Sequence, residues 1–522
     1  MKGDAWQNVG YIVATLLVLG MLSGCSALSE TGKGSEAFST TKPVALQPEK
    51  EIEVNPLEGF TLPDPADLSN LSWSEAFMQV HAKLAKEYAF TDWKGVSWPD
   101  LLDYFLPRIK QAEANQDEKA YYLALHEYIY SIPDGHISLT AHEPAVLTEI
   151  CREQVGGSYG LAVAELDDWR VVAAVVVSGG PAALAGMETG AEIVAWDEIP
   201  AQTAISSVDI AVLPYRMLTA EFSPSGESSK ATTVLRRLEQ AKLLTRGPVG
   251  RTVAVSFRNP GVEETRTEKL SAVLDADPAV SSLNALNFAA RPEFSSQVDV
   301  DIREGFGYIR LRAEVDMSDF SVYPTAIFQA FQNALTLFVD TKIPGVIIDL
   351  RGNYGGSDEL VSDLCGFFYD SMIAYEYLEL YDKRTDSFLK VGGYPITPAV
   401  PTYTGPVVAL VNPGTISSGE GLAAGISHLV NGAVIGFHGT NGSFGIAGGE
   451  ILLPGDYLVK YPYGRSVDSF GVVQLDSRNG MGGVIPTWRI PKTIENILAY
   501  AKGDDVEFAY AVKYLRTLIP AN

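Results

Sequence analysis

Short apolar runs alternate with amphipathic segments from Gly305 onward, and this alternation predicts an α/β fold for the second half of the chain. Strands are expected at Phe306–Leu311, Gly345–Leu350, Val407–Val411 and Ala433–Gly436, and helices at Pro324–Asp340 and Ser418–Val430. The run 345–350 is almost continuously apolar, which is typical of a strand buried on both faces of a sheet. Reactive groups are therefore expected where strands end and helices begin.

The first half of the chain has two different characters. The spacing from Trp73 to about Tyr130 is helical, and Ser72 can cap the first helix. Four short β-like runs follow, at Tyr159–Ala164, Arg170–Val177, Ala191–Ala195 and Thr252–Phe257. An insertion at about 206–246 contains an expected helix, Ser228–Leu244. We expect a multidomain α/β protein with these parts: a helical N-terminal domain (61–150), a β domain with a helical insertion (151–280), an α/β core (290–500) and a C-terminal helix (501–522).

The N-terminus has the pattern of an export signal. Lys2 is followed by the apolar run Tyr11–Leu22 and then by Ser23, Gly24 and Cys25. The run is shorter than the 20 or so residues that span a bilayer. The segment 22–25 resembles a lipobox, so residues 1–24 are predicted to be a lipoprotein signal peptide and Cys25 the lipidated residue, with a plain signal peptide as the alternative. Residues 25–60 are polar and rich in small residues, which predicts a flexible tether outside the cytoplasm, at the membrane.

Charge and cysteine content exclude some classes of function. The net charge is −25, which argues against a nucleic-acid partner because phosphate binding needs basic surface. Apart from Cys25, the cysteines are Cys151 and Cys365, which could form a disulfide or remain buried thiols. Neither a CxxC pair nor a Cys/His cluster is present, so no metal or other cofactor is expected.

Two turns in the α/β half have residues suited to acyl-transfer chemistry. The segment 349–356, Asp-Leu-Arg-Gly-Asn-Tyr-Gly-Gly, follows a buried strand, and its glycines would let N–H groups converge on an anionic oxygen. The segment 412–420, Asn-Pro-Gly-Thr-Ile-Ser-Ser-Gly-Glu, places Ser417 between a strand and a helix N-terminus. From spacing alone, Ser417 or Ser418 could equally serve only as a helix cap.

A histidine is available as a base in the loop Asp134-Gly135-His136, which follows the helical segment. A histidine in such a loop is often only solvated. Among the other histidines, His438 is the best competitor, because it follows the strand 433–436 near the expected active edge.

Together these three segments resemble peptidase family S41, the C-terminal-processing and tricorn-core serine peptidases, in its Ser–His branch. The resemblance covers about residues 72–490 and implies a ClpP/crotonase-like core. It also implies acyl transfer by Ser417 with His136 as the base. The oxyanion hole would then come from the N–H of Gly355 or Gly356 and of Ser418.

Residues 179–193, Gly-Gly-Pro-Ala-Ala-Leu-Ala-Gly-Met-Glu-Thr-Gly-Ala-Glu-Ile, resemble a PDZ domain. The resemblance places the carboxylate-binding loop at Tyr159, Gly160 and Leu161, where backbone N–H groups would capture a peptide C-terminus. The implied partners are extended or unfolded polypeptides.

The sequence departs from the family pattern at two places. The lysine of the Ser–Lys branch would fall on Gly442, which excludes that branch. The glutamate that orients the histidine in the Ser–His branch would fall on Gly480, with Asp476 or Gln474 as nearby replacements, and Gly135 stands where a serine is expected. The alternative function is therefore a catalytically weakened relative that binds peptides or acts as a scaffold.

Overall fold

The computed structural model describes residues 61–141, 145–210, 227–228, 230–274, 286–288, 296–315 and 323–519. The expected signal peptide, Cys25 and the tether lie outside these residues, as does most of the insertion before residue 227. Among the described residues, none of the helices has the length and apolar character needed to cross a membrane.

The α/β core predicted for the second half is confirmed, and its strands begin and end within about a residue of the predicted positions. Its sheet contains β13 (Val298–Arg303), β14 (Phe306–Leu311), β15 (Val346–Asp349), β20 (Val407–Leu410), β21 (Gly432–Gly436) and β24 (Trp488–Arg489), in that order. All neighbouring strands from β14 onward are parallel, and β13 is an antiparallel edge strand. Parallel strands bring their carboxyl ends to one edge, where the sequence placed its reactive turns.

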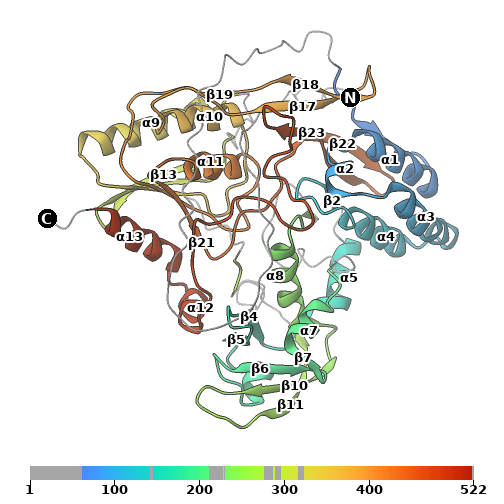
Figure 1. Cartoon of the computed structure of the whole chain (residues 1–522). Coiled ribbons are helices and arrows are strands. Elements are labelled where there is room, and N and C mark those ends of the chain that lie inside the picture. Colours follow the sequence, from blue (N-terminus) through green and yellow to red (C-terminus); the bar gives the residue numbers. More distant parts are fainter. Residues whose placement is uncertain are drawn as a thin grey trace, which may run out of the picture.

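Helices cover both faces of this sheet (Figure 1). One face packs against α9 (Thr325–Asp340), α10 (Asp358–Gly366) and α11 (Ser418–Ser427); the other packs against α12 (Ile494–Ala501) and α13 (Val506–Leu518). Side chains of β14 alternate accordingly: Ile309 and Leu311 lie in the first cluster, Phe306 and Tyr308 in the second. Burial on both faces explains why β15, β20 and β21 are almost continuously apolar.

A second sheet, which the sequence did not predict, joins the two ends of the chain. Its strands are β1 (Ala66–Asp67), β22 (Ile446–Leu453), β23 (Tyr457–Val467), β17 (Tyr377–Asp382) and β18 (Ser387–Gly392), with β2 (Ser138–Ala141) and β8 (Glu227–Ser228) added beside β23. β16 (Ile373–Ala374) and β19 (Pro395–Ile396) form a separate pair.

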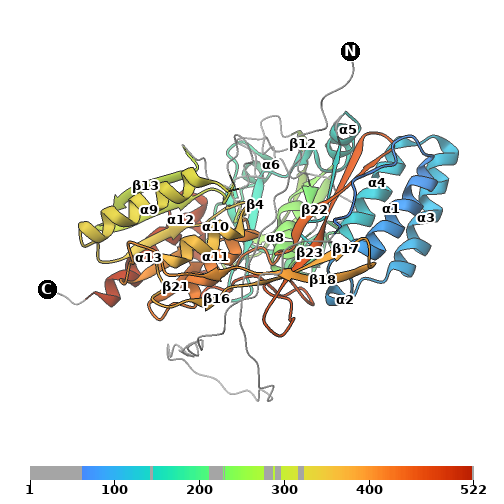
Figure 2. The same ribbon diagram turned by 90° about the horizontal axis from the view of Figure 1, so that it is seen from above.

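The N-terminal helices pack on this second sheet (Figure 2). They are α1 (Trp73–Glu87), α2 (Thr91–Lys94), α3 (Trp98–Asn115), α4 (Glu118–Tyr130) and α5 (Ala145–Val155). The predicted cap is present, since Ser72 and Glu75 form a capping box at the start of α1. Buried side chains of these helices and of β22 and β23 form one cluster, so the helical segment shares its core with the C-terminal half.

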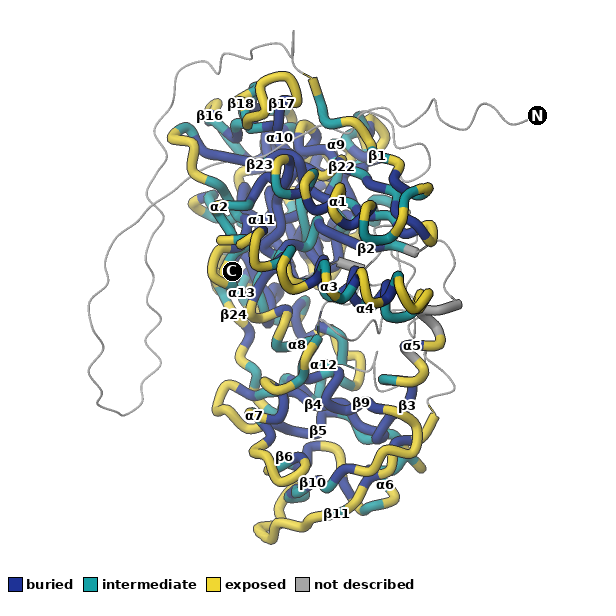
Figure 3. The backbone as a smooth tube through the Cα atoms, turned by 90° about the vertical axis from the view of Figure 1, so that its right-hand side faces the viewer, coloured by how far each residue is buried: buried dark blue, intermediate teal, exposed yellow. Residues whose placement is uncertain are grey.

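The β-like runs of residues 155–275 form a sheet at the lower end of the molecule (Figure 3). Its order is β11 (Arg266–Ser271), β10 (Thr252–Arg258), β6 (Glu192–Trp196), β5 (Val171–Val176) and β4 (Leu161–Glu165), with β7 (Ile199–Pro200) paired to β6. A small sheet contains β3 (Gly157–Ser158), β9 (Arg246–Gly247) and β12 (Val273–Leu274). The helices here are α6 (Pro181–Leu184), α7 (Ala201–Ser206) and α8 (Thr233–Leu244).

The start of α8 contacts the loops at the active edge of the core sheet. The Thr233 N–H donates to the carbonyl of Gly480 at 2.7 Å. A Cβ on Gly442 would lie 2.8 Å from the Thr232 methyl group, so the two segments are in close contact. The lower sheet is thus connected to the candidate site through the helix of the insertion.

Candidate active site

Ser417 occupies a strained position between β20 and α11. Its backbone has φ 58° and ψ −132°, a conformation that residues other than glycine rarely adopt. The side chain of Ser417 makes no capping hydrogen bond to the helix, so the alternative of a simple helix cap is not realised there. Strain of about 1–3 kcal/mol at one residue persists where the surrounding structure fixes it, often at functional sites.

The glycine turn (residues 351–356) lies against Ser417 and requires glycine at two positions. A Cβ on Gly355, which has φ +77°, would lie 2.5 Å from the Cβ of Ser417. A Cβ on Gly356 would lie 2.4 Å from the carbonyl carbon of Glu314. A side chain at either position would therefore collide with its neighbour, and the close approach of the turn to Ser417 would be lost.

The N–H groups of this turn differ in what they bind. The Gly355 N–H donates to Asn353 Oδ1 at 2.8 Å and is occupied. Among the described residues, we find no acceptor for the N–H of Gly356 or of Ser418. The Ser418 hydroxyl donates to the carbonyl of Gly356 at 2.9 Å, which places these two residues side by side.

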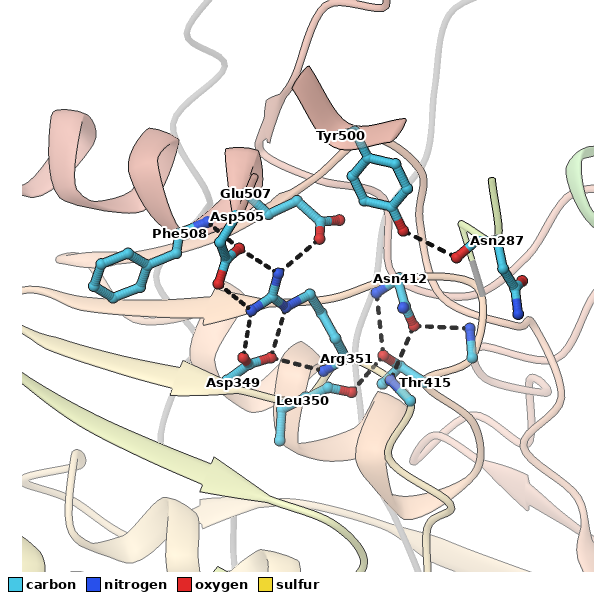
Figure 4. A network of polar contacts seen from close by, with 12 residues as sticks. Asn287, Asp349, Leu350, Arg351, Asn412, Thr415, Tyr500, Asp505, Glu507 and Phe508 are labelled. Atoms are coloured by element: carbon cyan, nitrogen blue, oxygen red, sulfur yellow. Dashed lines mark hydrogen bonds and ion pairs between the residues drawn. The ribbon is translucent and has the colours of Figure 1, made fainter. Parts of the chain in front are cut away.

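Hydrogen bonds tie the glycine turn to the Ser417 turn (residues 412–417) (Figure 4). Thr415 Oγ1 donates to the Leu350 carbonyl at 2.7 Å, and the Gly352 N–H donates to Asn412 Oδ1 at 3.0 Å. A third bond runs from the Ile416 N–H to the Asn353 carbonyl at 3.1 Å. The relative position of the two turns is thus set by several bonds.

Arg351 anchors the same turn to the C-terminal helix (Figure 4). Its guanidinium binds Asp349 at 2.6 Å, Asp505 at 2.6 Å and Glu507 at 2.8 Å. Burial raises the pKa of Asp349, but the Arg351 charge and hydrogen bonds outweigh it and hold that pKa below its ordinary value. Arg351 therefore has a structural role, and its charge does not face Ser417.

The histidine loop (residues 131–137) is held between α4 and β2. β2 pairs with β23, with Ser138 opposite Lys460, so the loop is fixed at both ends. The His136 N–H donates to Asp134 Oδ1 at 2.8 Å, and His136 Nδ1 lies 3.9 Å from the same oxygen. Burial lowers the pKa of His136 from its ordinary 6.5; Asp134 opposes this shift and Lys94 adds to it.

Ser443 brings the histidine loop and the Ser417 turn together. Its carbonyl accepts the Ser417 N–H at 3.1 Å, and its hydroxyl accepts the Gly135 N–H at 2.8 Å. A Cβ on Gly135 would lie 3.1 Å from the Ile416 side chain and 2.6 Å from Ser443 Oγ. Gly135, which replaces the expected serine, is therefore required by the close contact of the two segments.

Glu420 fixes the segment that contains Ser443. Its carboxylate accepts the N–H of Gly442 at 2.7 Å, the N–H of Ser443 at 3.0 Å and the hydroxyl of Thr440. Burial raises the pKa of Glu420 to about 8, and these donors act in the opposite direction. The sequence marked Glu420 only as part of a motif; the structure shows how it orders residues 440–443.

Asp476, expected as a possible orienter of His136, is buried close to the histidine loop but has other partners. Its carboxylate lies 2.5 Å from Lys94 Nζ and accepts the Phe444 N–H at 2.7 Å. Within the described residues, the carboxylate that lies next to His136 is Asp134. Sequence reasoning missed Lys94, because a lysine in a one-turn helix carries no signal of burial.

The competing histidine, His438, lies in a different environment. Its ring packs edge-on against Phe288, with the ring centroids 5.1 Å apart. Burial lowers its pKa to about 3, with smaller contributions from Lys492 and Arg489. Nothing in its described contacts connects His438 to Ser417.

The described segments contain no group of three His, Cys, Asp or Glu residues arranged to hold a metal ion. Cys365 is a buried free thiol, and burial raises its pKa. Of the two alternatives left open for Cys151 and Cys365, a disulfide or two buried thiols, the free Cys365 agrees with the second, and the side chain of Cys151 lies outside the described residues.

Two N–H groups of the expected carboxylate-binding loop have acceptors within the chain. The Tyr159 N–H donates to the Thr245 carbonyl at 3.2 Å, and the Gly160 N–H donates to Ser158 Oγ at 3.0 Å. Leu161 begins β4, which is the edge strand of its sheet. A peptide could therefore add beside β4, but its carboxylate would have to displace Thr245 and Ser158.

A cavity of about 450 Å³ lies at the far end of β4, away from Ser417. It is lined by Glu165, Leu166, Trp169, Gln202, Thr203, Ser206, Arg237 and Lys492. Arg237 of α8 binds Glu165 of β4 through both carboxylate oxygens, at 2.7 and 2.6 Å, and so closes this end of the space between the helix and the strand.

The arrangement of the two turns agrees with a sequence comparison. The sequence pattern of peptidase family S41 matches residues 306–485, which include both turns and Ser443. This segment of the chain belongs to peptidase family S41. The match of this segment supports a serine peptidase. No curated protein matches the chain in sequence.

Solved structures show the same fold. Mature CPAF in complex with lactacystin is 14% identical, with a TM-score of 0.55, over 86% of this chain and 98% of that chain. A CPAF mutant is 13% identical, with a TM-score of 0.56, and the match covers 86% of this chain and 97% of that chain. The photosystem II D1 C-terminal processing protease is 19% identical over 84% of this chain and 99% of that chain, with a TM-score of only 0.35. The chain therefore shares the overall fold of CPAF.

Replacing Gly355 with alanine should reduce peptidase activity by at least about 100-fold, because the new methyl group would displace Ser417 by a fraction of an ångström or more. Gly261→Ala is the matched control. Gly261 has φ +75°, close to the +77° of Gly355, but a Cβ at this position would meet no atom within 4 Å. Steady-state kinetics and thermal unfolding of both variants would separate the effect of the collision with Ser417 from the effect of a non-glycine residue at positive φ. Equal activity of the two variants would contradict the role of the close contact.

Proposed function

We propose that the chain is an endopeptidase or C-terminal-processing peptidase that cleaves extended polypeptides, with Ser417 as nucleophile and His136 as base. The observation that carries the proposal is the double role of Ser443, which binds the N–H of Ser417 and the N–H of Gly135. Through it, the strained Ser417 at the start of α11 and the loop that contains His136 are bound to the same residue, which supports the pairing of these two side chains.

In the acylation step, Ser417 Oγ attacks the scissile carbonyl carbon while its proton passes to His136 Nε2. The C–N bond then breaks, and His136 returns the proton to the departing amine. A water molecule attacks the resulting ester by the same proton path and releases the acid product. The lowered pKa of His136 keeps the ring neutral, and thus able to accept a proton, at neutral pH.

Two N–H groups are suited to hold the oxyanion. Gly356 and Ser418 are adjacent, and neither N–H has another acceptor among the described residues. Gly355, the other candidate, positions the turn, since its N–H is bound to Asn353. The start of α11 adds a favourable helix dipole for negative charge. Donors of this kind contribute about 100- to 1000-fold in rate each.

Asp134 is the group best placed to orient His136. With Asp134 beside Nδ1, the proton of the neutral ring would reside on Nδ1, and Nε2 would be left as the base. The separation of 3.9 Å is longer than a hydrogen bond, and such contacts commonly shorten when substrate binds. Asp476 would act on His136 only indirectly.

The edge strand β4 and the loop at Tyr159, Gly160 and Leu161 support a PDZ-like role in substrate capture. A polypeptide would add beside β4, and its C-terminal carboxylate would replace Thr245 and Ser158 as the acceptor of the loop N–H groups. Thr245 directly follows α8, and the other end of α8 contacts Gly480. Binding of a peptide at the loop would therefore shift α8 and the residues that it contacts at the active edge.

One observation favours a second function, that of a catalytically weakened peptide-binding protein. The Nδ1 atom of His136 is buried and has no hydrogen-bond partner within the described structure. A histidine without a fixed tautomer can lose most of its catalytic effect. Under this alternative the chain would bind extended peptides through β4 without cleaving them.

Cys25 and the preceding apolar run support a location outside the cytoplasm, with a lipid anchor at the membrane. The polar stretch 26–58 would then hold the peptidase away from the bilayer.

Ser417→Ala and His136→Ala should each lower kcat for unfolded casein by at least about 10⁴-fold, because removing one member of a catalytic pair disables proton transfer. Ser427→Ala, at the other end of α11, is the matched control, because its hydroxyl binds only a helix carbonyl. Cleavage that survives Ser417→Ala would reject this nucleophile. Binding of casein without cleavage by the unmodified protein would support the second function.

A peptide with a free C-terminus should be cleaved with a lower KM than the same peptide with a C-terminal amide, because the amide lacks the charge that the loop N–H groups would bind. Steady-state kinetics with the matched peptide pair would measure the difference. Equal KM values would sink the idea of C-terminal recruitment and leave the peptidase proposal intact.

Cells that export the chain should incorporate labelled fatty acid into it, and Cys25→Ser should abolish the labelling because the thiol is the acceptor. Fractionation of the cells would show whether the chain is recovered with the membranes and whether Cys25→Ser releases it. A chain that is exported but unlabelled would indicate a plain signal peptide.

A further inference from the structure

A buried lysine joins the histidine loop to a segment near the C-terminal end of the core. Lys94 is the last residue of α2, and only 1% of its side chain is exposed. Its Nζ lies 2.5 Å from Asp476 Oδ1 and 3.0 Å from Ser477 Oγ on one side. On the other side it lies 2.9 Å from the Pro133 carbonyl and 3.9 Å from Asp134 Oδ2.

The same Asp134 is the carboxylate beside His136. Its Oδ1 accepts the His136 N–H at 2.8 Å, and its Oδ2 accepts the Tyr88 hydroxyl at 2.7 Å. Each oxygen of Asp134 therefore has a donor, and Lys94 fixes the backbone immediately before it. The side chains of Asp476, Lys94 and Asp134 are at most 1% exposed and that of His136 is 11% exposed, so solvent screens their charges little.

Two charges of this cluster act on His136 in opposite directions: Asp134 raises its pKa and Lys94 lowers it. Burial raises the pKa of Asp476 to about 7, and the charge of Lys94 acts in the opposite direction. Glu420 is the next acidic group that acts on Lys94, and Asp476 in turn acts on Glu420. Without Lys94, two carboxylates would remain in the interior with no cation, which is costly.

We propose that Lys94 is a positioning residue of the peptidase, which holds the histidine loop in place through Pro133 and Asp134 and sets the charge around His136. The proposal rests on the proposed function of His136. Buried ion pairs often add little net stability, so four contacts of one lysine to these two segments are better explained by the need for one defined geometry.

The charges predict opposite effects for two substitutions. Lys94→Met removes a positive charge near His136, so the pKa of His136 should rise and the acid limb of kcat/KM should move to higher pH. Asp476→Asn removes a negative charge and keeps the shape, so the limb should move to lower pH. In both variants kcat should fall by about 10- to 100-fold while KM changes less, because proton transfer is affected more than binding.

The matched control is Lys83→Met. Lys83 forms a partly buried ion pair with Glu87 on α1 at 2.8 Å, and none of its described contacts reaches the histidine loop. Its pH profile should equal that of the unmodified peptidase. The other titratable groups that face the cluster are Tyr88, Asp134, Asp476 and Glu420. Burial raises the pKa of Asp476 to about 7 and that of Glu420 to about 8, whereas it raises the pKa of Tyr88 well above its ordinary value. Asp476 and Glu420 can therefore titrate near His136, and the two opposite substitutions are needed to assign the shift to His136.

NMR titration of the histidine rings, with His136→Gln to assign the signal, would be recorded alongside the kinetics. Opposite shifts of the His136 signal in Lys94→Met and Asp476→Asn support the proposal. Unchanged shifts, or shifts in one direction for both variants, would overturn it. If Lys94→Met does not fold, the proposal is tested by Asp476→Asn alone, in which the pKa of His136 should fall and the acid limb of kcat/KM should move to lower pH. Absence of cleavage by the unmodified protein would reject the proposed function, while the NMR shifts would still test the charge coupling.

Discussion

The candidate site depends on one serine that is not itself expected to react. Ser443 accepts the N–H of Ser417 with its carbonyl and the N–H of Gly135 with its hydroxyl. Glu420 holds the backbone of Ser443, so a single carboxylate in α11 determines where both reactive segments lie. The strained backbone of Ser417 and the close packing of Gly135 are both consequences of this arrangement.

Buried charges are used in two different ways around the site. On the far side of the core sheet, Arg351 is surrounded by Asp349, Asp505 and Glu507, which locks the C-terminal helix to the glycine turn. Beside His136, Lys94 faces two carboxylates that belong to separate segments. The first cluster stabilises a turn whose shape is set by glycines. The second lies beside the proposed base, His136.

Much of the core could be predicted from sequence, because its central strands β15, β20 and β21 are buried on both faces and are therefore almost continuously apolar. The strand at 306–311 forms as predicted, and helix 324–340 begins one residue later than predicted. The β22–β23 hairpin was missed, since glycines and polar residues interrupt its alternation, and so was its packing against α1 and α4. At the site, the motifs predicted the two turns and the histidine loop. They could not predict Lys94 or the role of Ser443, because these depend on contacts between residues more than 300 positions apart.

The strand β2, which follows His136 directly, pairs with β23 from the other end of the chain. A polypeptide that emerges from a ribosome or a translocon in the order of its sequence therefore presents His136 long before the strand that fixes it exists. Ser417 and Ser443 also emerge before the parts of the chain that hold them in place, because β23 and the segment around Asp476 follow them in sequence. With the proposed function, the hydrolytic site would be complete only after nearly all of the chain has been made.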